Sequence, residues 1–224
     1  MKTPAAPAKP AAKPPAKPRA KSVTKPSVKP SENPAATPPL TIFTVGHSTH
    51  PIGDFVALLQ SHGVSQIIDI RTIPKSRRNP QFNSGALAAS LRDAGIAYVH
   101  VKALGGLRHP KPDSINLAWR NAGFRGYADY MQTPEFAAAL ERAIELARQR
   151  PTALMCAEAV PWRCHRSLVS DALVARGIRV LEIISAAQPK EHELTSFAHV
   201  RGHQITYPAR SGAQEQQKEM FVED

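Results

Sequence analysis

The chain of 224 residues contains only two cysteines, and few of its residues are aromatic. Two cysteines are too few for the disulfide framework of a small secreted domain, so we expect a reducing compartment and a cytoplasmic protein. No apolar run approaches the roughly 20 residues of a membrane-spanning helix. The N-terminus also lacks the apolar segment of a secretion signal. We therefore expect no membrane partner.

Acidic residues are almost absent from residues 1–39, which hold eight basic residues, eleven of the 21 prolines and only one acid, Glu32. This segment carries +7 of the formal net charge of +11. It has no apolar periodicity, so it cannot bury enough surface to offset the loss of chain entropy, and we expect a disordered basic tail. Such a tail binds nucleic acid by releasing counterions. The alternative is a solubilising linker.

From residue 41 onward, short apolar runs alternate with amphipathic segments. The runs predict strands at 41–45, 66–71, 97–101, 152–155 and 179–184, and helical periodicity predicts helices near 54–62, 84–94, 134–150 and 167–176. This alternation is typical of an α/β fold in three layers, a mostly parallel sheet with helices on both faces. Residues 111–130 are expected to be irregular, with aromatic side chains that cover the core. We place the folded domain at 40–205 and a flexible C-terminal tail at 206–224.

The segment 154–167 contains both cysteines, Cys156 and Cys164, together with Glu158, His165 and two arginines. It follows a predicted strand and precedes a predicted helix. Ligands of open parallel sheets bind beyond the carboxyl ends of the strands, so we expect the site here. A helix N-terminus and nearby arginines lower the pKa of a cysteine. We predict that Cys156, Glu158, Cys164 and His165 are catalytic.

Further cations and polar groups follow two other predicted strands. Arg71 ends the second strand, and four cations fall within residues 71–78. His47 and Ser48 follow the first strand at the same edge of the sheet. We predict that these side chains and the motif's arginines bind an anionic substrate in one cationic pocket. The predicted substrate-binding residues are His47, Ser48, Arg71, Arg77, Arg163 and Arg166.

Several short motifs together resemble one protein family. They are Gly46-His47-Ser48, Asp69-Ile70-Arg71 followed by Pro74, Ser76 and Arg77, Leu104-Gly105-Gly106, Tyr127-Ala128-Asp129-Tyr130, Cys156-Ala157-Glu158 and Cys164-His165-Arg166. Over about residues 41–205 the chain resembles domain of unknown function family 488 (DUF488). A weaker likeness is to rhodanese-type domains, in which an Asp-x-Arg strand end precedes a cysteine loop. The resemblance implies the fold and the position of the site and leaves the reaction open.

Three classes of function fit these features. The first is an enzyme or binding protein associated with nucleic acid, for example in DNA repair, in which Glu158 acts as a general base and His165 transfers protons. The second is a rhodanese- or phosphatase-like thiol enzyme that uses Cys156 or Cys164 as its nucleophile on a small anionic substrate. The third is a non-catalytic adaptor that recruits partners through its tails.

The remaining motifs concern cofactors and partners. The glycines at 105–106 lack the spacing of a dinucleotide or phosphate-binding loop, so we expect no cofactor. The segment from Gln216 to Phe221 is similar to the peptides by which bacterial replication and repair proteins bind the sliding clamp, which makes the clamp a candidate partner. His192, His199 and His203 are interpreted as surface histidines rather than metal ligands. The spacing of the cysteines leaves two alternatives open, a zinc site that includes His165 and a disulfide.

Overall fold

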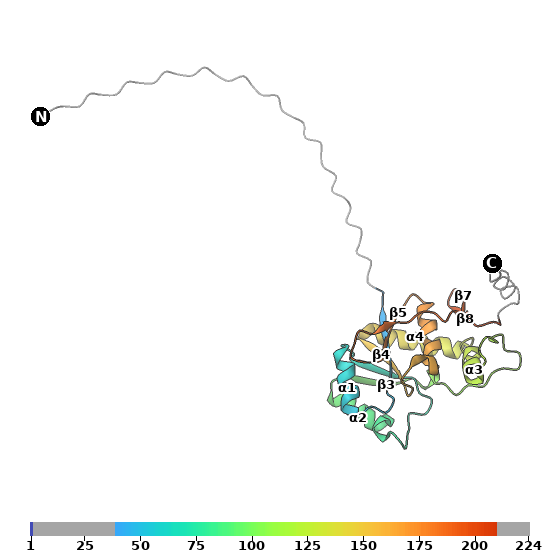
Figure 1. The fold of residues 1–224 in the computed structure, drawn as a ribbon, viewed down its shortest axis with the longest axis horizontal. Coiled ribbons are helices and arrows are strands. Elements are labelled where there is room, and N and C mark those ends of the chain that lie inside the picture. Colours follow the sequence, from blue (N-terminus) through green and yellow to red (C-terminus); the bar gives the residue numbers. More distant parts are fainter. Residues whose placement is uncertain (2–38, 210–224) are drawn as a thin grey trace, which may run out of the picture. The chain divides into compact units, whose positions relative to one another are not determined.

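The computed structural model describes Met1 and residues 39–209 of the chain (Figure 1). Nearly all of the predicted basic tail and the whole clamp-like segment from Gln216 to Phe221 lie outside the described residues. The description below therefore concerns residues 39–209.

The main sheet has six strands in the order β3-β2-β4-β1-β5-β6, which confirms the predicted α/β fold. The strands from β1 to β5 run parallel and only β6 is antiparallel, so the sheet is mostly parallel, as predicted. A separate hairpin joins β7 and β8. The bounds are β1 (Thr41–Gly46), β2 (Gln66–Asp69), β3 (Ala97–His100), β4 (Thr152–Cys156), β5 (Arg179–Ile183), β6 (Lys190–Glu191), β7 (His199–Arg201) and β8 (Gln204–Thr206).

Helices cover both faces of the sheet and make three layers (Figure 1). The α-helices are α1 (Ile52–Ser61), α2 (Ser84–Asp93), α3 (Ala122–Tyr130), α4 (Pro134–Gln149) and α5 (Arg166–Val174). Single 3-10 turns form η1 (Pro80–Phe82), η2 (Lys102–Leu104) and η3 (Pro161–Arg163). None of the helices between residues 39 and 209 is both long and apolar enough to span a membrane.

β4 lies in the middle of the sheet and is buried along its whole length. Leu154 packs into the core on the side of α3, α4 and α5, whereas Ala153 and Met155 pack into the core on the side of α1 and α2. This alternation follows from the two-residue period of a strand. A strand buried on both faces needs a continuous apolar sequence, and that is why this strand is visible in the sequence.

α4 begins where the sequence predicts. The Thr133 hydroxyl accepts a hydrogen bond from the backbone N–H of Phe136 (3.3 Å), Pro134 starts the helix, and Glu135 adds negative charge to the first turn. The buried side chains of α4 recur every three or four residues and form its inward face. They are Phe136, Ala139, Leu140, Ala143, Ile144 and Ala147.

α3 corrects the expectation that residues 111–130 are irregular. The Asn121 side chain caps this helix by accepting hydrogen bonds from the backbone N–H of Gly123 (2.8 Å) and of the next residue (3.2 Å). Two glycines weaken the helical pattern in the sequence. Gly126, however, packs so tightly that an added Cβ would lie 2.5 Å from the backbone carbon of His109. The residue that hides α3 from sequence analysis is therefore the one that lets it pack against the neighbouring loop.

His192 is not the surface histidine that the sequence suggested, because it is buried between two carboxylates. Its Nε2 lies 2.9 Å from Asp171 Oδ1, and its Nδ1 lies 2.7 Å from Glu182 Oε1. The fully buried Tyr207 donates its hydroxyl hydrogen to Asp171 Oδ2 (2.8 Å). This network joins α5, β5 and the last described segment, so the packed domain extends past residue 205 to at least Tyr207.

The His192 network predicts a loss of stability at alkaline pH. Burial opposes the charge on His192, but hydrogen bonds to Asp171 and Glu182 raise its pKa to about 9. Because the pKa of an unfolded histidine is about 6.5, this stabilisation is complete below pH 6.5 and disappears as the pH rises through 9. We expect the free energy of unfolding to fall by at most about 3 kcal/mol over this interval. Urea titrations at several pH values measure it.

The control for this prediction is His192→Gln. Its unfolding free energy should be lower at pH 6.5 and should change much less between pH 6.5 and 9. An unchanged pH dependence in the variant would contradict the assignment of the effect to His192.

Candidate functional site

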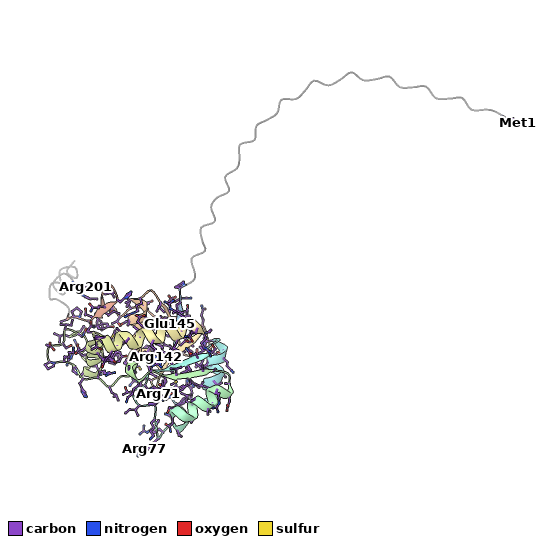
Figure 2. The ribbon with its side chains drawn as sticks, turned by 180° about the vertical axis from the view of Figure 1, so that it is seen from behind. Met1, Arg71, Arg77, Arg142, Glu145 and Arg201 are labelled. Atoms are coloured by element: carbon purple, nitrogen blue, oxygen red, sulfur yellow. The ribbon has the colours of Figure 1, made fainter. Side chains whose placement is uncertain are left out.

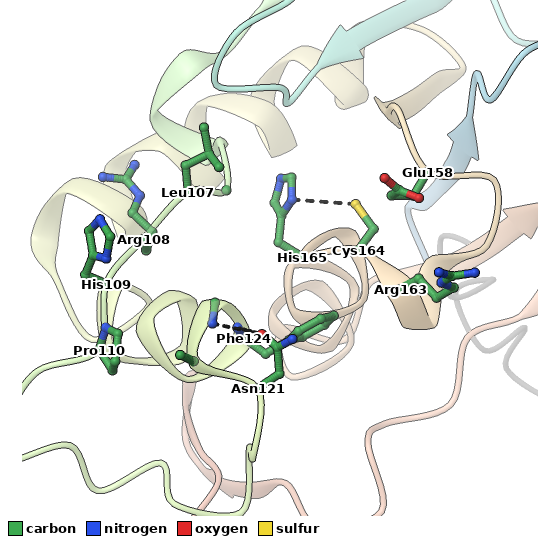
Figure 3. A pocket seen from close by; sticks show the side chains of 13 residues that line it. Leu107, Arg108, His109, Pro110, Asn121, Phe124, Glu158, Arg163, Cys164 and His165 are labelled. Carbon is green, nitrogen blue, oxygen red and sulfur yellow. Dashed lines mark hydrogen bonds between the residues drawn. The ribbon is translucent and has the colours of Figure 1, made fainter.

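Glu158 lines two of the cavities that open near the carboxyl ends of the parallel strands. The first, which we call the Cys164 cavity, has a volume of about 510 Å³ (Figure 3). It is lined by residues 106–110, residues 121–124, Glu158, Arg163, Cys164 and His165. The second, the His47 cavity, has a volume of about 420 Å³. It is lined by residues 47–49, Arg71, Ile73, Lys75, Ser76, Asn79 and residues 157–159.

The two cysteines lie together at the base of the Cys164 cavity. Cys156 ends β4 and Cys164 precedes α5, and their Sγ atoms are 2.7 Å apart, with Cys164 donating its thiol hydrogen to Cys156. Both are free cysteines. Cys164 lines the cavity, whereas Cys156 is 1% exposed and lines neither cavity. A reagent in the cavity therefore meets Cys164 first.

Arg166 lies behind the cysteines and is 1% exposed. Its NH1 donates hydrogen bonds to Cys156 Sγ (3.3 Å) and to the backbone oxygen of Glu158 (3.3 Å), and NH2 donates to the backbone oxygen of Ala159 (3.3 Å). Within residues 39–209, no carboxylate forms an ion pair with this guanidinium. A buried cation needs an anion nearby. The Cys156 thiolate is the group in position to supply it.

The pKa values of the two thiols move in opposite directions. The hydrogen bond from Cys164 and the positive charge of Arg166 lower the pKa of Cys156, although burial opposes this. The pKa of Cys164 is raised, because its hydrogen is held by the Cys156 sulfur and because it is buried beside that negative charge. The two thiols share a hydrogen-bonded proton and therefore titrate as a unit.

His165 adds a proton acceptor next to Cys164. Its Nε2 donates a hydrogen bond to the backbone oxygen of Ile70 (3.1 Å), which leaves Nδ1 without a hydrogen, 3.5 Å from Cys164 Sγ (Figure 3). Burial lowers the pKa of His165 to about 4, so the ring is neutral at pH 7. An added Cβ at Gly106 would lie 2.9 Å from Nδ1, so a glycine there leaves room beside this atom.

The loop after β4 carries Glu158 across the end of β1. Gly46 makes this crossing possible, since an added Cβ would lie 1.8 Å from the backbone oxygen of Glu158. The backbone N–H of Ser48 donates a hydrogen bond to the backbone oxygen of Ala157 (2.9 Å). Together with the hydrogen bonds from Arg166, this contact fixes the loop and places the exposed Glu158 side chain between the two cavities.

The His47 cavity contains a second buried charge pair. Arg71 and Asp69 form a salt bridge (NH2 to Oδ2, 2.6 Å), and Tyr98 donates its hydroxyl hydrogen to Asp69 Oδ2 (2.8 Å). His47 Nδ1 donates to the backbone oxygen of Ser48 (2.8 Å), so its Nε2 accepts from Arg71 NH1 (3.1 Å). Burial lowers the pKa of His47 to about 4. The charge of Arg71 is thus compensated before any ligand arrives.

The comparisons with known proteins agree with this description. Residues 51–173, more than half of the chain, match the model of the family described as "Domain of unknown function DUF488". The chain belongs to the DUF488 family. No curated protein and no solved structure matches the chain significantly. The resemblance deduced from the sequence motifs is therefore confirmed, and the family's description assigns no reaction.

The predicted site residues of this DUF488 domain fall into separate groups. One group gathers at the Cys164 cavity and comprises Cys156, Glu158, Arg163, Cys164, His165 and Arg166. A second group lies at the His47 cavity and comprises His47, Ser48 and Arg71. Arg77 is exposed, lines neither cavity, and lies at the periphery of the domain, away from Arg71 (Figure 2).

The four arginines therefore do not form the single cationic pocket that the sequence suggested. Arg71 is paired with Asp69, Arg166 is buried beside Cys156, and Arg77 lies elsewhere on the surface. Only Arg163 is an exposed arginine that lines the Cys164 cavity beside the cysteines (Figure 3).

Several residues of the DUF488 site were missed by sequence reasoning. Asp69 was noticed only within the family motif, although its spacing to Arg71 suits a local salt bridge. The far wall of the Cys164 cavity comes from the loop 106–110 and from the start of α3, with Asn121 and Phe124. Nothing in the local sequence connects these segments with the cysteines, because the contact exists only in the folded chain.

In the described part of the DUF488 chain, no three His, Cys, Asp or Glu side chains are grouped so that they could hold a metal ion. For example, the Nε2 atom of His165 already donates a hydrogen bond to the backbone oxygen of Ile70 and is therefore not free to bind a metal ion. The zinc alternative that the sequence left open thus has no complete set of ligands among residues 39–209.

The pairing of Arg166 with Cys156 predicts coupled effects on stability. Cys156→Ala leaves a buried cation unpaired and Arg166→Met leaves a buried thiol without its counterion, so each should cost about 3–5 kcal/mol. The double variant should cost less than the sum, by at least about 1 kcal/mol. Denaturant unfolding of all four proteins measures this coupling. The matched control is Cys164→Ala, which removes the same atoms and the hydrogen bond to Cys156 but leaves Cys156 in contact with Arg166.

Cys164→Ala should therefore be milder than Cys156→Ala. Equal costs for the two cysteines, together with an additive double variant, would contradict the ion pair.

Proposed function

We propose that this domain is a thiol enzyme that acts on a small anionic substrate, with Cys164 as the nucleophile. The observation that carries the proposal is the buried Arg166 beside two cysteines in contact, one of which lines a cavity. Burying a charge without an anionic partner costs free energy. An ionised thiol beside Arg166 offsets this cost, whereas two neutral thiols do not. A cysteine whose pKa is lowered by a nearby cation is typical of catalytic thiols; here that cysteine is Cys156, which shares its proton with Cys164.

The nucleophile is formed by a shift of one proton. Cys164 holds the proton at rest and donates it toward Cys156 over 2.7 Å. When the proton moves to Cys156, the negative charge passes to Cys164, which faces the cavity. The neutral Nδ1 of His165, 3.5 Å from Cys164 Sγ, offers a second acceptor for the same proton.

The lining of the cavity supports an anionic substrate of modest size. Arg163 is exposed at the wall next to Cys164, and the loop 106–110 adds Arg108 and His109. The Arg108 guanidinium stacks on Tyr130, 3.5 Å from the ring centroid, so Arg163 is the cation freer to meet a ligand. Glu158, at the same wall, is placed to exchange protons with the substrate or the leaving group.

Alkylation kinetics test this function. Because the pair ionises as a unit beside Arg166 and the proposed proton shift passes the charge to Cys164, Cys164 should react with iodoacetamide at pH 7 faster than a model thiol, and its rate should rise with pH from a lower pH than that of the model thiol. Iodoacetate should gain further from the positive charge of Arg163. In Arg163→Gln, the ratio of the iodoacetate to the iodoacetamide rate should fall about fivefold, the factor for one charge interaction of ~1 kcal/mol.

The control for the charge effect is Arg92→Gln, which removes an exposed arginine of α2 that lines neither cavity. Peptide mapping identifies the labelled cysteine. Cys164 reacting no faster than the model thiol, with no difference between the two variants, would overturn the proposal.

We propose a second function for residues 1–39, which is binding of nucleic acid by the basic tail. Its support is the charge of +7 on 39 residues with a single acid. Because such binding releases counterions, the affinity for duplex DNA should fall steeply with salt in the full chain. A chain that begins at Pro39 should bind much more weakly at every salt concentration. Equal affinities, or no binding by either chain, would exclude a role for the tail.

A further inference from the structure

Cys156 lines neither cavity, yet its sulfur contacts the sulfur of Cys164, which lines the Cys164 cavity. A thiol nucleophile does not need a second thiol in contact with it. Disulfide bonds have an S–S length of about 2.05 Å, so the two Sγ atoms at 2.7 Å need little movement to bond. Cys156 ends a strand and Cys164 precedes a helix, so both approach from fixed elements. We propose that Cys164 and Cys156 form a dithiol–disulfide couple that reduces small, carboxylate-bearing disulfides.

The proposal rests on the thiol function above and names its substrate class. The cavity of about 510 Å³ is far larger than a peroxide and accommodates a small organic molecule. Arg163 provides a positive charge for a carboxylate next to the reacting sulfur. Cys164 is the sulfur that the substrate reaches, and Cys156 is the sulfur that resolves the intermediate.

In the first step, the proton on Cys164 moves to Cys156, and the Cys164 thiolate attacks one sulfur of the substrate disulfide. A bond forms between Cys164 and that sulfur, the substrate S–S bond breaks, and the other half leaves as a thiolate. The leaving thiolate takes the proton from Cys156, which regains its negative charge beside Arg166. The products are a mixed disulfide on Cys164 and one free thiol.

In the second step, the Cys156 thiolate attacks Cys164 Sγ of the mixed disulfide. The protein disulfide forms, and the second half of the substrate leaves as a thiolate that takes a proton from water. Overall, two protein sulfurs lose two electrons and two substrate sulfurs gain them. A low-molecular-weight thiol returns the protein to its starting state by the reverse exchange.

The experiment treats the full-length reduced protein with dithiodiglycolate, a dicarboxylate disulfide, and with hydroxyethyl disulfide, a neutral one. Samples quenched with acid at successive times are mapped by mass spectrometry without reduction. We expect a transient adduct on Cys164, then a disulfide between Cys156 and Cys164. The dicarboxylate should react about fivefold faster, and Arg163→Gln should remove this preference while Arg92→Gln should keep it.

The single-cysteine variants identify the roles. In Cys156→Ser the adduct on Cys164 should persist, and in Cys164→Ser no adduct should form on Cys156, which lines no cavity. If Cys156→Ser does not fold because Arg166 loses its counterion, the time course of the unaltered protein still decides. An adduct that stays on Cys164 without disulfide formation overturns this inference and leaves the thiol function intact. An unreactive Cys164 overturns both.

Discussion

The buried Arg166 guanidinium is the constraint on which the candidate site depends. Removing an arginine from water costs several kcal/mol unless an anion and hydrogen-bond acceptors replace the water. Here two backbone oxygens of the loop after β4 and the sulfur of Cys156 take that place. One side chain thereby fixes the loop, favours the thiolate and places Cys156 against Cys164. The arrangement of the site is in this sense a consequence of the burial of one charge.

The buried arginines at the two cavities have partners of different chemistry. Arg71 is paired with the carboxylate of Asp69, and Tyr98 holds that carboxylate in place. Arg166 is paired with a thiol, whose pKa is lowered by its surroundings. The first pair stabilises structure without creating reactivity. The second pair favours the nucleophilic form of a sulfur, which makes the Cys164 cavity the better candidate for chemistry.

The sequence predicted the order of strands and helices because their signals are local. The buried strand at Thr152–Cys156 is a continuous apolar run, and α4 has a capping threonine, a proline and an apolar stripe. α3 was missed because its glycines serve a tertiary contact, and Gly126 meets a backbone far away in the chain. The gathering of the cysteines could also be predicted, since they flank one loop. The different environments of the four arginines could not be predicted, because burial and pairing depend on tertiary packing that the local sequence does not show.

The same buried charge also bears on the proposed redox couple. In the reduced protein Arg166 faces the Cys156 thiol and favours its ionised form, whereas in the proposed disulfide form both sulfurs would be neutral and the guanidinium would keep only its backbone acceptors. The reduced state is therefore favoured by the interaction that the disulfide loses, which assists the return of the protein to its dithiol form by a low-molecular-weight thiol and opposes the oxidation step of the proposed cycle. A structural crosslink needs the opposite balance. The burial of Arg166 thus suits a bond that forms and breaks during turnover rather than one that holds the fold together.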